Sequence, residues 1–406
     1  MMKARLHLRA TVRTGANGFT LVELMVALTI GLVLALAISL SMLSMGRQFR
    51  VVGATSAAQV NSQLALSLID SAGRTAGAGF FNNGQPVCPI FNAWNAGTLV
   101  SNGVALLPAR IIDGGSATAS DRLVFSASNA IGPLSGMPVV APMGAGSDPI
   151  TVIESGRISV NDLGIVGVPG QPAVPCTLIQ VTAITTDTTG ATCGGNATSC
   201  KALSHAPGGN YNPPTGTFSN SPRYGFATLA PVVGPAVVMG LGTGFRQEAF
   251  AVMCETLVQY DAFSDTPTCT TGPLNFTGGA NALVSDIVLL QAQYGITNDA
   301  NDSVEAWVDA TGGTWANPSA ADISRIKAVR VVIVSRSKEA ASELVTPATC
   351  TNTGGVVNTG PCSFDDAEAP VIDLSATNVP SGQSWRNYRY RVQQAVVPLR
   401  NVIWSN

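Results

Sequence analysis

The chain has 406 residues, of which 22 are basic and 24 acidic, so its formal net charge is −2 and a general nucleic-acid-binding surface is disfavoured. Only 11% of the residues are charged, whereas glycine is abundant with 42 residues. This composition is typical of loop-rich β structure outside the cytosol rather than of a helical enzyme. The length exceeds that of a typical single domain, although one large domain is also compatible with it.

The chain begins with a basic leader followed by a long apolar run. Residues 1–18 contain no acidic residue and four basic ones, which are Lys3, Arg5, Arg9 and Arg13. Residues 24–46 are 23 residues without a charge. A helix that rises about 1.5 Å per residue would cover ~35 Å here, enough to cross a hydrocarbon core of ~30 Å. Because basic flanks stay in the cytoplasm, we expect residues 19–46 to be a single span with a cytoplasmic N-terminus.

One carboxylate, Glu23, lies at the start of this apolar run. An ionised side chain inside a bilayer costs roughly 3 kcal/mol or more unless it is paired. A cut after Gly18 would give Phe19 a free α-amine, and Phe19 and Glu23 share a helix face because they are four residues apart. The new cation could pair with Glu23 in the same chain or in a neighbouring one.

The six residues from Gly18 to Glu23, GFTLVE, match at every position the leader motif of type IV prepilins and type II secretion pseudopilins, which this stretch resembles. The resemblance implies cleavage after Gly18 by prepilin peptidase, N-methylation of Phe19, and helix-by-helix assembly in which Glu23 offsets a neighbouring N-terminus. The alternatives are an ordinary membrane anchor and a secretory signal peptide. The run is longer than the ~7–15 apolar residues of a signal peptide, and residues 39–44 lack an A-x-A cleavage site.

Residues 47–75 are expected to continue the helix in amphipathic form. Apolar residues recur there at spacings of three to five and should lie against a globular domain: Val52, Ala57, Val60, Leu64 and Leu68. Asp70 and Arg74 form an i, i+4 pair near the end, and Gly73, Gly77 and Gly79 are expected to end the helix.

Residues 76–406 are predicted to form an extracytoplasmic β-rich domain. Its part from 80 to 240 is rich in insertions, with loops and at most one short strand at 80–120 and an exposed, disulfide-clipped loop at 186–222. Residues 285–296 fit either a helix or a strand, and residues 325–336 form the strongest strand, central in a sheet because both faces are apolar. The other expected strands are 122–126, 150–154, 177–185, 249–261 and 388–400. The predicted fold class is α+β: a long N-terminal pilin-type helix, with a membrane half and an amphipathic half, packed on an antiparallel sheet domain with long disulfide-clipped loops.

Eight cysteines follow the apolar run, an even number that indicates disulfides in an oxidising compartment: Cys88, Cys176, Cys193, Cys200, Cys254, Cys269, Cys350 and Cys362. They allow 105 pairings. Sequence proximity favours Cys193–Cys200, Cys254–Cys269 and Cys350–Cys362, which leaves Cys88–Cys176. A zinc site is disfavoured because no C-x-x-C occurs and the only downstream histidine is His205.

The chain contains no catalytic motif of the G-x-S-x-G or Walker A type, and we expect no enzyme activity and no cofactor. His205 is expected to be an exposed loop histidine. Residues 385–391 mix basic and aromatic residues, but a packed face with a solvated edge explains them better than nucleic-acid binding. A weak calcium candidate follows residue 298, where a solvated polar turn is favoured because Val304 and Ala310 hold the EF-hand glycine and glutamate positions: its residues are Asp299, Asn301, Ser303 and Glu305.

Three segments of residues 249–406 resemble the PilW family of minor type IV pilins. They are 286–295 (DIVLLQAQYG), 328–337 (AVRVVIVSRS) and 390–401, which ends in Leu-Arg-Asn; residues 72–77 also resemble the R-x-A-G turn of that family. Residues 80–240 match no family that we can name.

The resemblance implies a minor pilin that takes part in pilus assembly, primes filament initiation and lies at or near the tip, with roles in twitching motility and adhesion. Its partners would be other minor pilins, the major pilin, prepilin peptidase and the inner-membrane assembly platform. It would span the inner membrane once, with a periplasmic domain, and enter the extracellular pilus. The alternatives are a J-type minor pseudopilin of a type II secretion system and a tip adhesin or DNA-binding module that uses residues 80–240.

Overall fold

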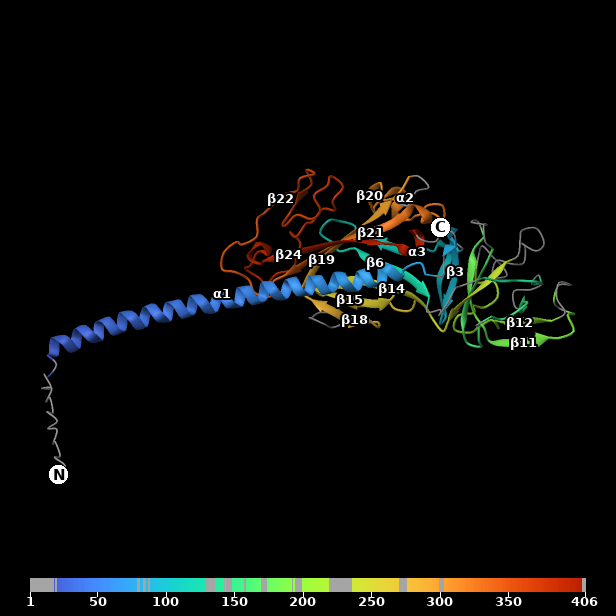
Figure 1. Ribbon diagram of the computed structural model, residues 1–406, viewed down its shortest axis with the longest axis horizontal. Coiled ribbons are helices and arrows are strands. Elements are labelled where there is room, and N and C mark those ends of the chain that lie inside the picture. The colour runs from blue at the N-terminus through green and yellow to red at the C-terminus, as the bar shows by residue number, and fades with distance from the viewer. Residues whose placement is uncertain are drawn as a thin grey trace, which may run out of the picture. The chain divides into compact units, whose positions relative to one another are not determined.

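The computed structural model describes residues 18, 20–78, 81–82, 85–86, 88–128, 136–141, 143, 148–156, 158–168, 174–191, 193, 199–218, 236–269, 276–298 and 303–403. The chain divides into two compact units, Met1–Gly53 and Ala54–Asn406 (Figure 1). Helix α1 (Leu21–Thr75) begins in the first unit and ends in the second.

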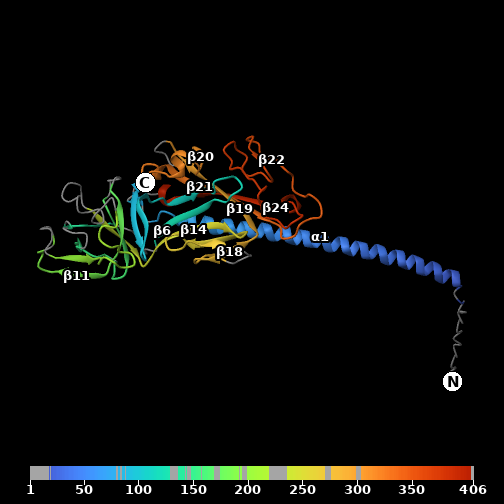
Figure 2. The ribbon, with the colours of Figure 1, turned by 180° about the vertical axis from the view of Figure 1, so that it is seen from behind.

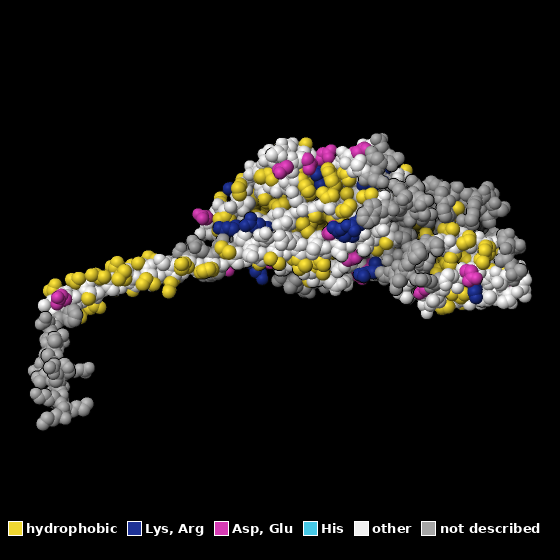
Figure 3. Space-filling model, in the orientation of Figure 1, with side chains coloured by type: hydrophobic (Ala, Val, Ile, Leu, Met, Phe, Trp, Pro, Cys, Tyr) yellow, Lys and Arg dark blue, Asp and Glu magenta, His cyan; other side chains and the backbone are white. Residues whose placement is uncertain are grey.

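The first unit consists, over its described residues, almost entirely of the N-terminal part of α1. Leu21–Met42 has a mean hydropathy of 2.6 and is long and apolar enough to cross a membrane, and none of it is buried against the rest of the chain. Figure 3 shows hydrophobic side chains along this part of the helix. This apolar helix fits a membrane anchor.

The second unit is built from strands in several sheets. The five-stranded sheet has the order β18 (Asn281–Ser285), β15 (Thr256–Asp261), β14 (Phe245–Met253), β6 (Arg122–Ser128), β5 (Ala109–Ile112). The four-stranded sheet has the order β20 (Ala306–Asp309), β19 (Ile287–Ile296), β21 (Ile326–Arg336), β24 (Tyr390–Pro398). The six-stranded sheet has the order β4 (Thr98–Ala105), β3 (Ile90–Asn95), β10 (Cys176–Gln180), β9 (Leu163–Gly167), β13 (Val237–Gly242), β7 (Met137–Pro138). The three-stranded sheet has the order β11 (Ala183–Asp187), β12 (Cys200–Ser204), β8 (Ile150–Val152).

Short elements complete the unit. Three two-stranded ribbons are β1 (Phe81–Asn82) with β2 (Gln85–Pro86), β16 (Thr268–Cys269) with β17 (Phe276–Thr277), and β22 (Cys350–Thr351) with β23 (Val357–Asn358). The short helices are α2 (Gly313–Ala316), η1 (Ile323–Arg325), η2 (Trp385–Asn387) and α3 (Arg400–Ile403). Among these strands only β3 and β10 pair in parallel. The α+β class with a mostly antiparallel sheet domain is therefore confirmed. Figure 2 shows β11 at the end of the domain opposite β22.

The main core lies where α1 contacts the five-stranded and four-stranded sheets. Helix residues Ala65, Leu66, Ile69 and Ala72 are buried there against side chains from both sheets, such as Phe250 and Val331. The expected stripe was wrong in its register, because Val60 and Leu64 are 58% and 47% exposed. The buried face is made mostly of small residues, which let the helix approach the sheets closely, so the larger aliphatic residues remain outside.

Gly73 lies inside α1, not at its end, and lets the helix approach β24. A Cβ at residue 73 would lie 2.3 Å from Cγ1 of Val397, a buried and stiff side chain. The helix instead ends near Gly77, whose φ of 77° suits a C-terminal cap and whose N–H donates to Ser126 O at 2.9 Å.

We expect Gly73→Ala to destabilise the domain by about 1 kcal/mol. The overpacking cost of roughly 1–3 kcal/mol exceeds the gain in helix propensity of up to ~1 kcal/mol. Urea unfolding of the full chain in detergent, followed by tryptophan fluorescence, measures this. Gly53→Ala is the matched control, since its Cβ would meet nothing within 4 Å; equal midpoints for the two variants would contradict the close-approach explanation.

The strand expected at 249–261 is wrong: the structure has a hairpin. Cys254 and Glu255 form the turn between β14 and β15 with φ values of 49° and 56°. A two-residue turn exchanges the faces of the following residues, so Phe250 and Leu257 reach the helix-side core, whereas Ala251 and Val258 reach the other face. Both faces are apolar and the turn lacks glycine, so the sequence pattern did not reveal it.

Two further expectations for the middle of the chain are wrong. Residues 80–120 contain the strands β3, β4 and β5 instead of loops with at most one strand. The tract 186–222 is not simply an exposed loop, because it contains β12 and buried residues such as Leu203 and Phe218. Because the tract is rich in polar residues, the sequence pattern did not reveal the short strand β12, which pairs with β11 on one side and β8 on the other.

The C-terminal strands follow the sequence pattern closely. The ambiguous segment 285–296 forms the strand β19, and the strongest expected strand forms β21, which pairs with β19 and β24 and is buried along almost its whole length. The last expected strand forms β24, at the edge of this sheet.

Candidate functional site

The start of α1 is closed by reciprocal hydrogen bonds between Thr20 and Glu23. The Glu23 N–H donates to Thr20 Oγ1 at 3.2 Å, while Thr20 N and Thr20 Oγ1 donate to Glu23 Oε2 at 3.0 and 2.9 Å. This is a capping box, in which two otherwise unsatisfied N–H groups of the first turn receive partners. Glu23 was expected only to pair with a cation; its role in this cap was not predicted, although the spacing Thr-x-x-Glu could have revealed it.

The cap fixes the carboxylate of Glu23 close to the expected cleavage point. Both Thr20 donors bind Oε2, and within the described residues no hydrogen bond reaches Oε1. Gly18 is exposed, and a Cβ added to it would meet nothing within 4 Å. Phe19 and the leader before Gly18 lie outside the described residues, so the α-amine of Phe19 stays a prediction.

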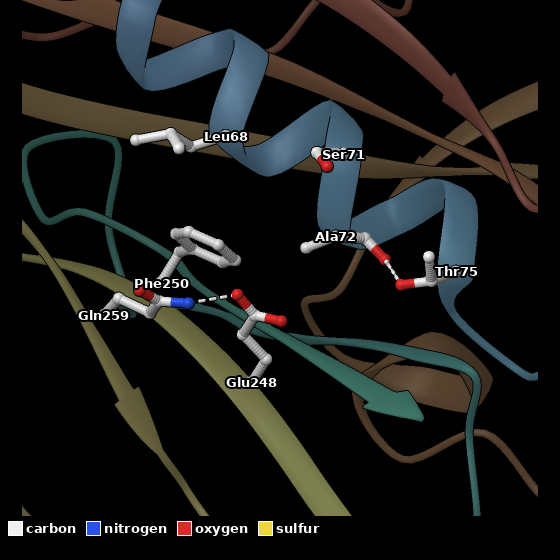
Figure 4. Close-up of a pocket in the computed structure, with 7 residues that line it drawn as sticks. All are labelled: Leu68, Ser71, Ala72, Thr75, Glu248, Phe250 and Gln259. Atoms are coloured by element: carbon white, nitrogen blue, oxygen red, sulfur yellow. Dashed lines mark hydrogen bonds between the residues drawn. The ribbon is translucent and has the colours of Figure 1, made fainter. Parts of the chain in front are cut away.

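A groove of about 180 Å³ lies between α1 and the hairpin of β14 and β15. In Figure 4 the helix lines one side and the hairpin the other: the lining residues are Leu68, Ser71, Ala72, Thr75, Glu248, Phe250 and Gln259. Its single carboxylate, Glu248, accepts a hydrogen bond from Gln259 Nε2. The hydroxyl groups of Ser71 and Thr75 have no histidine or second carboxylate beside them among the lining residues, and Thr75 Oγ1 donates to Ala72 O, so the groove does not resemble an active site.

His205 is not an exposed loop histidine as expected. It is fully buried, and its Nε2 lies 2.9 Å from the carbonyl oxygen of Asp148. Burial lowers the pKa of His205, since desolvation disfavours its charged form. The tract that carries it folds into a core, where a neutral histidine serves packing.

The cysteines form four disulfides: Cys88–Cys176, Cys193–Cys200, Cys254–Cys269 and Cys350–Cys362. The last three are the pairs that sequence proximity favours, and the first is the pair that this leaves. Asp187 lies with Cys193 and Cys200 within ligand distance, but a metal needs thiolates and these sulfurs are joined to each other.

The calcium candidate is only partly described. Asp299 and Asn301 lie outside the described residues, so their convergence with Ser303 and Glu305 stays untested. The Glu305 carboxylate accepts the N–H of Asn298 at 2.9 Å. That bond gives Glu305 a structural role in the turn after β19.

Arg330 lies at the centre of a buried cluster on the face of the four-stranded sheet away from α1. Only 1% of its side chain is exposed, and it donates to Gln293 Oε1 at 2.5 Å and to Asp366 Oδ2 at 2.7 Å. The guanidinium carbon lies over the rings of both Trp307 and Phe364, at 4.8 and 4.9 Å from their centroids. The cluster joins β19, β20 and β21 to the long segment between β21 and β24.

Asp121 is a buried carboxylic acid beside β6 and β19. Its two oxygens accept the N–H groups of Gly114 at 3.0 Å and Ala292 at 2.8 Å. Desolvation nevertheless raises the pKa of Asp121 to about 7.

The contribution of Asp121 to stability should therefore fall as pH rises. Between pH 4 and 7 the folded chain holds a proton that the unfolded chain has lost, so stability is lost as pH rises towards 7. We expect the stability difference between the wild type and Asp121→Asn to shrink by about 2 kcal/mol from pH 5 to pH 8, measured by urea unfolding. The exposed acid Asp365 provides the control variant Asp365→Asn; a pH-independent difference for Asp121→Asn would contradict this prediction.

Comparison with known proteins adds two family matches. Residues 268–401 match the family described as Type IV Pilus-assembly protein W, and residues 13–39 match the Prokaryotic N-terminal methylation motif. No curated protein matches the chain. No solved structure matches it.

The methylation motif covers the leader boundary and the apolar start of α1, and the other match covers β19, β21, β24 and the Arg330 cluster. A capped apolar helix followed by an α+β domain with these matches defines a membrane-anchored, type IV pilin-like protein. Within this class, residues 268–401 are similar to the family of the type IV pilus-assembly protein W, and the two matches together support involvement in type IV pilus assembly. These families are structural components of pilus assembly, not enzymes.

Proposed function

We propose that this chain is a minor pilin that primes filament initiation and then lies at or near the pilus tip. It is cut after Gly18, methylated on Phe19 and held in the inner membrane by residues 19–46, with its N-terminus cytoplasmic and its domain periplasmic. The observation that carries this proposal is the capping box at Thr20 and Glu23, at the start of an apolar helix that matches the methylation motif.

The exposed surface of α1 supports assembly with similar subunits. Val60 and Leu64 lie on one face of the helix, four residues apart, and stay largely exposed on the free chain. An apolar helix face exposed to solvent indicates that another surface covers it in an assembly. The partners would be other minor pilins and the major pilin, assembled on the inner-membrane platform after processing by prepilin peptidase.

The size of the domain favours the tip over the shaft. The unit Ala54–Asn406 carries a six-stranded and a three-stranded sheet in addition to the sheets that pack on α1. A shaft must pack the same domain many times, whereas a tip subunit occurs once and has no such constraint.

Deletion of the gene and immunogold labelling of sheared filaments test this function. We expect the deletion strain to lose most surface pili and twitching motility, and label to occur at filament ends. Even labelling along the filaments would exclude the tip position. Normal piliation combined with a loss of protein secretion would favour the pseudopilin alternative.

A further inference from the structure

The outer edge of β24 is the least protected strand edge in the described part of the domain. Strand β24 has nine residues, all paired with β21 without a register shift. Among the described residues its other side has no neighbouring strand, because β24 ends the four-stranded sheet. Exposed, long and regular edges can accept a further strand.

The other described edges are shorter or irregular. Strands β5, β7 and β20 have four residues or fewer, and β18 has five. Strand β4 has eight residues, but its register with β3 shifts twice, which disrupts regular pairing. By contrast, the only residues of β24 that disfavour pairing with a further strand are Arg391 near its start and Pro398 at its end.

The unpaired groups of β24 belong to its even-numbered residues. Leu399 N donates to Lys327 O and Ser337 N to Arg389 O, so the odd-numbered residues face β21 across this ladder. The N–H and C=O groups of Tyr390, Val392, Gln394 and Val396 therefore point outward, and among the described residues no backbone partner meets them.

The side chains along this edge differ between the two faces of the sheet. On one face, Tyr390 and Val392 pack on the core beside Ile372, and Val396 is 47% exposed. On the other face lie Arg389 and Arg391, and neither forms an ion pair with a described acid. An added strand would therefore meet mainly apolar side chains, with Gln394 between them, on one face. On the other face it would meet Arg389 and Arg391, which pair with no described acid, near the start of β24, whereas Ala395 and Val397 further along pack towards α1.

We propose that the edge of β24 binds an extended segment of another protein by β-strand addition. The segment alternates apolar residues, which extend the Val392 and Val396 face, with polar residues that include carboxylates opposite Arg389 and Arg391. Main-chain hydrogen bonds to the even-numbered residues of β24 provide binding, and the charge and alternation provide selectivity. Strand addition at β24 is a function beyond pilus initiation, because neither family match assigns a binding surface or a ligand chemistry to this edge.

A peptide-binding experiment with the full chain in detergent micelles tests this proposal. The probe is a ten-residue peptide that alternates valine with threonine and carries two aspartates in place of threonines; the control peptide has lysines at those two positions. We expect the acidic peptide to bind at least tenfold more tightly than the lysine peptide. No binding at the highest soluble concentration, or equal binding of both peptides, would overturn the proposal.

Two variants at residue 394 separate the backbone from the side chain. Gln394→Pro removes an outward N–H, which an edge strand tolerates, and should weaken binding at least tenfold. Gln394→Ala keeps the N–H and should bind within twofold of the wild type. Equal affinities for these two variants would show that the peptide binds elsewhere.

Hydrogen exchange on the wild type tests strand addition at the edge of β24 even if Gln394→Pro does not fold. In the free chain, the amides of Val392, Gln394 and Val396 should exchange quickly, whereas those of Gln393 and Ala395 should be protected. The acidic peptide should slow exchange at the even-numbered amides at least tenfold. Unchanged exchange at these amides in the presence of bound peptide would exclude strand addition at this edge.

Discussion

Glu23→Val should leave cleavage after Gly18 largely intact but reduce the number of surface pili at least tenfold. The carboxylate is the only acidic group at the start of the apolar span, so valine removes the partner of the expected Phe19 amine. The Phe19 amine, left without a partner in the membrane, would cost roughly 3 kcal/mol, which exceeds the 1.4 kcal/mol that corresponds to a tenfold change in an equilibrium constant. The readouts are the mass of the processed chain and pilus counts by electron microscopy.

Glu23→Gln separates the two roles that the structure gives to this side chain. A glutamine carbonyl can still accept from Thr20 N and Oγ1, so the capping box persists, whereas the charge is lost. If the charge matters for assembly, Gln and Val should be equally defective. If only the cap matters, which contributes about 1 kcal/mol to stability, the Glu23→Gln variant should assemble normally and the Glu23→Val variant should not. Normal piliation in both variants would contradict the proposed role of Glu23.

The parts of the fold that could be predicted from the sequence are those with one dominant pattern. The membrane span follows from an uninterrupted apolar run, and β21 follows from a β-branched run that is apolar on both faces. The hairpin at Cys254 and Glu255 could not be predicted, because residues with positive φ that are not glycine leave no local signal. The buried face of α1 was assigned to the wrong residues, since close approach selects Ala58, Ala65 and Gly73 over larger apolar residues.

The candidate site was predictable in its residues but not in its geometry. The order Gly18-Phe19-Thr20-Leu21-Val22-Glu23 identifies a leader motif, yet only the structure shows both Thr20 donors on one carboxylate oxygen of Glu23. Sequence also gives no hint of the partners of Arg330, because Gln293, Trp307 and Asp366 are 37, 23 and 36 residues away and meet it only through the sheet. Long-range clusters of this kind need the strand register, which periodicity does not supply.

Arg330→Met should destabilise the domain by roughly 3 kcal/mol. The substitution leaves Oε1 of buried Gln293 without its donor and removes the guanidinium that packs over Trp307 and Phe364. The ion pair itself adds little, since the Asp366 side chain is 45% exposed and can be rehydrated. The Arg330 guanidinium donates to both carboxylate oxygens of Asp366, to Oδ2 at 2.7 Å and to Oδ1 at 3.2 Å. Arg330→Lys should also be destabilising, because an ammonium cannot make this bidentate contact or stack over the two rings.

Arg325 provides a matched control for this prediction. It also lies over a tryptophan, Trp315, at 4.9 Å and pairs with an aspartate, Asp322, at 2.9 Å, but 35% of its side chain is exposed. Arg325→Met should therefore cost less than about 1 kcal/mol. Urea unfolding of the full-length variants in detergent, monitored by tryptophan fluorescence, compares the two. A large difference would show that the buried contacts of Arg330 stabilise the domain, and equal losses would show that the Arg330 cluster does not hold this part of the domain together.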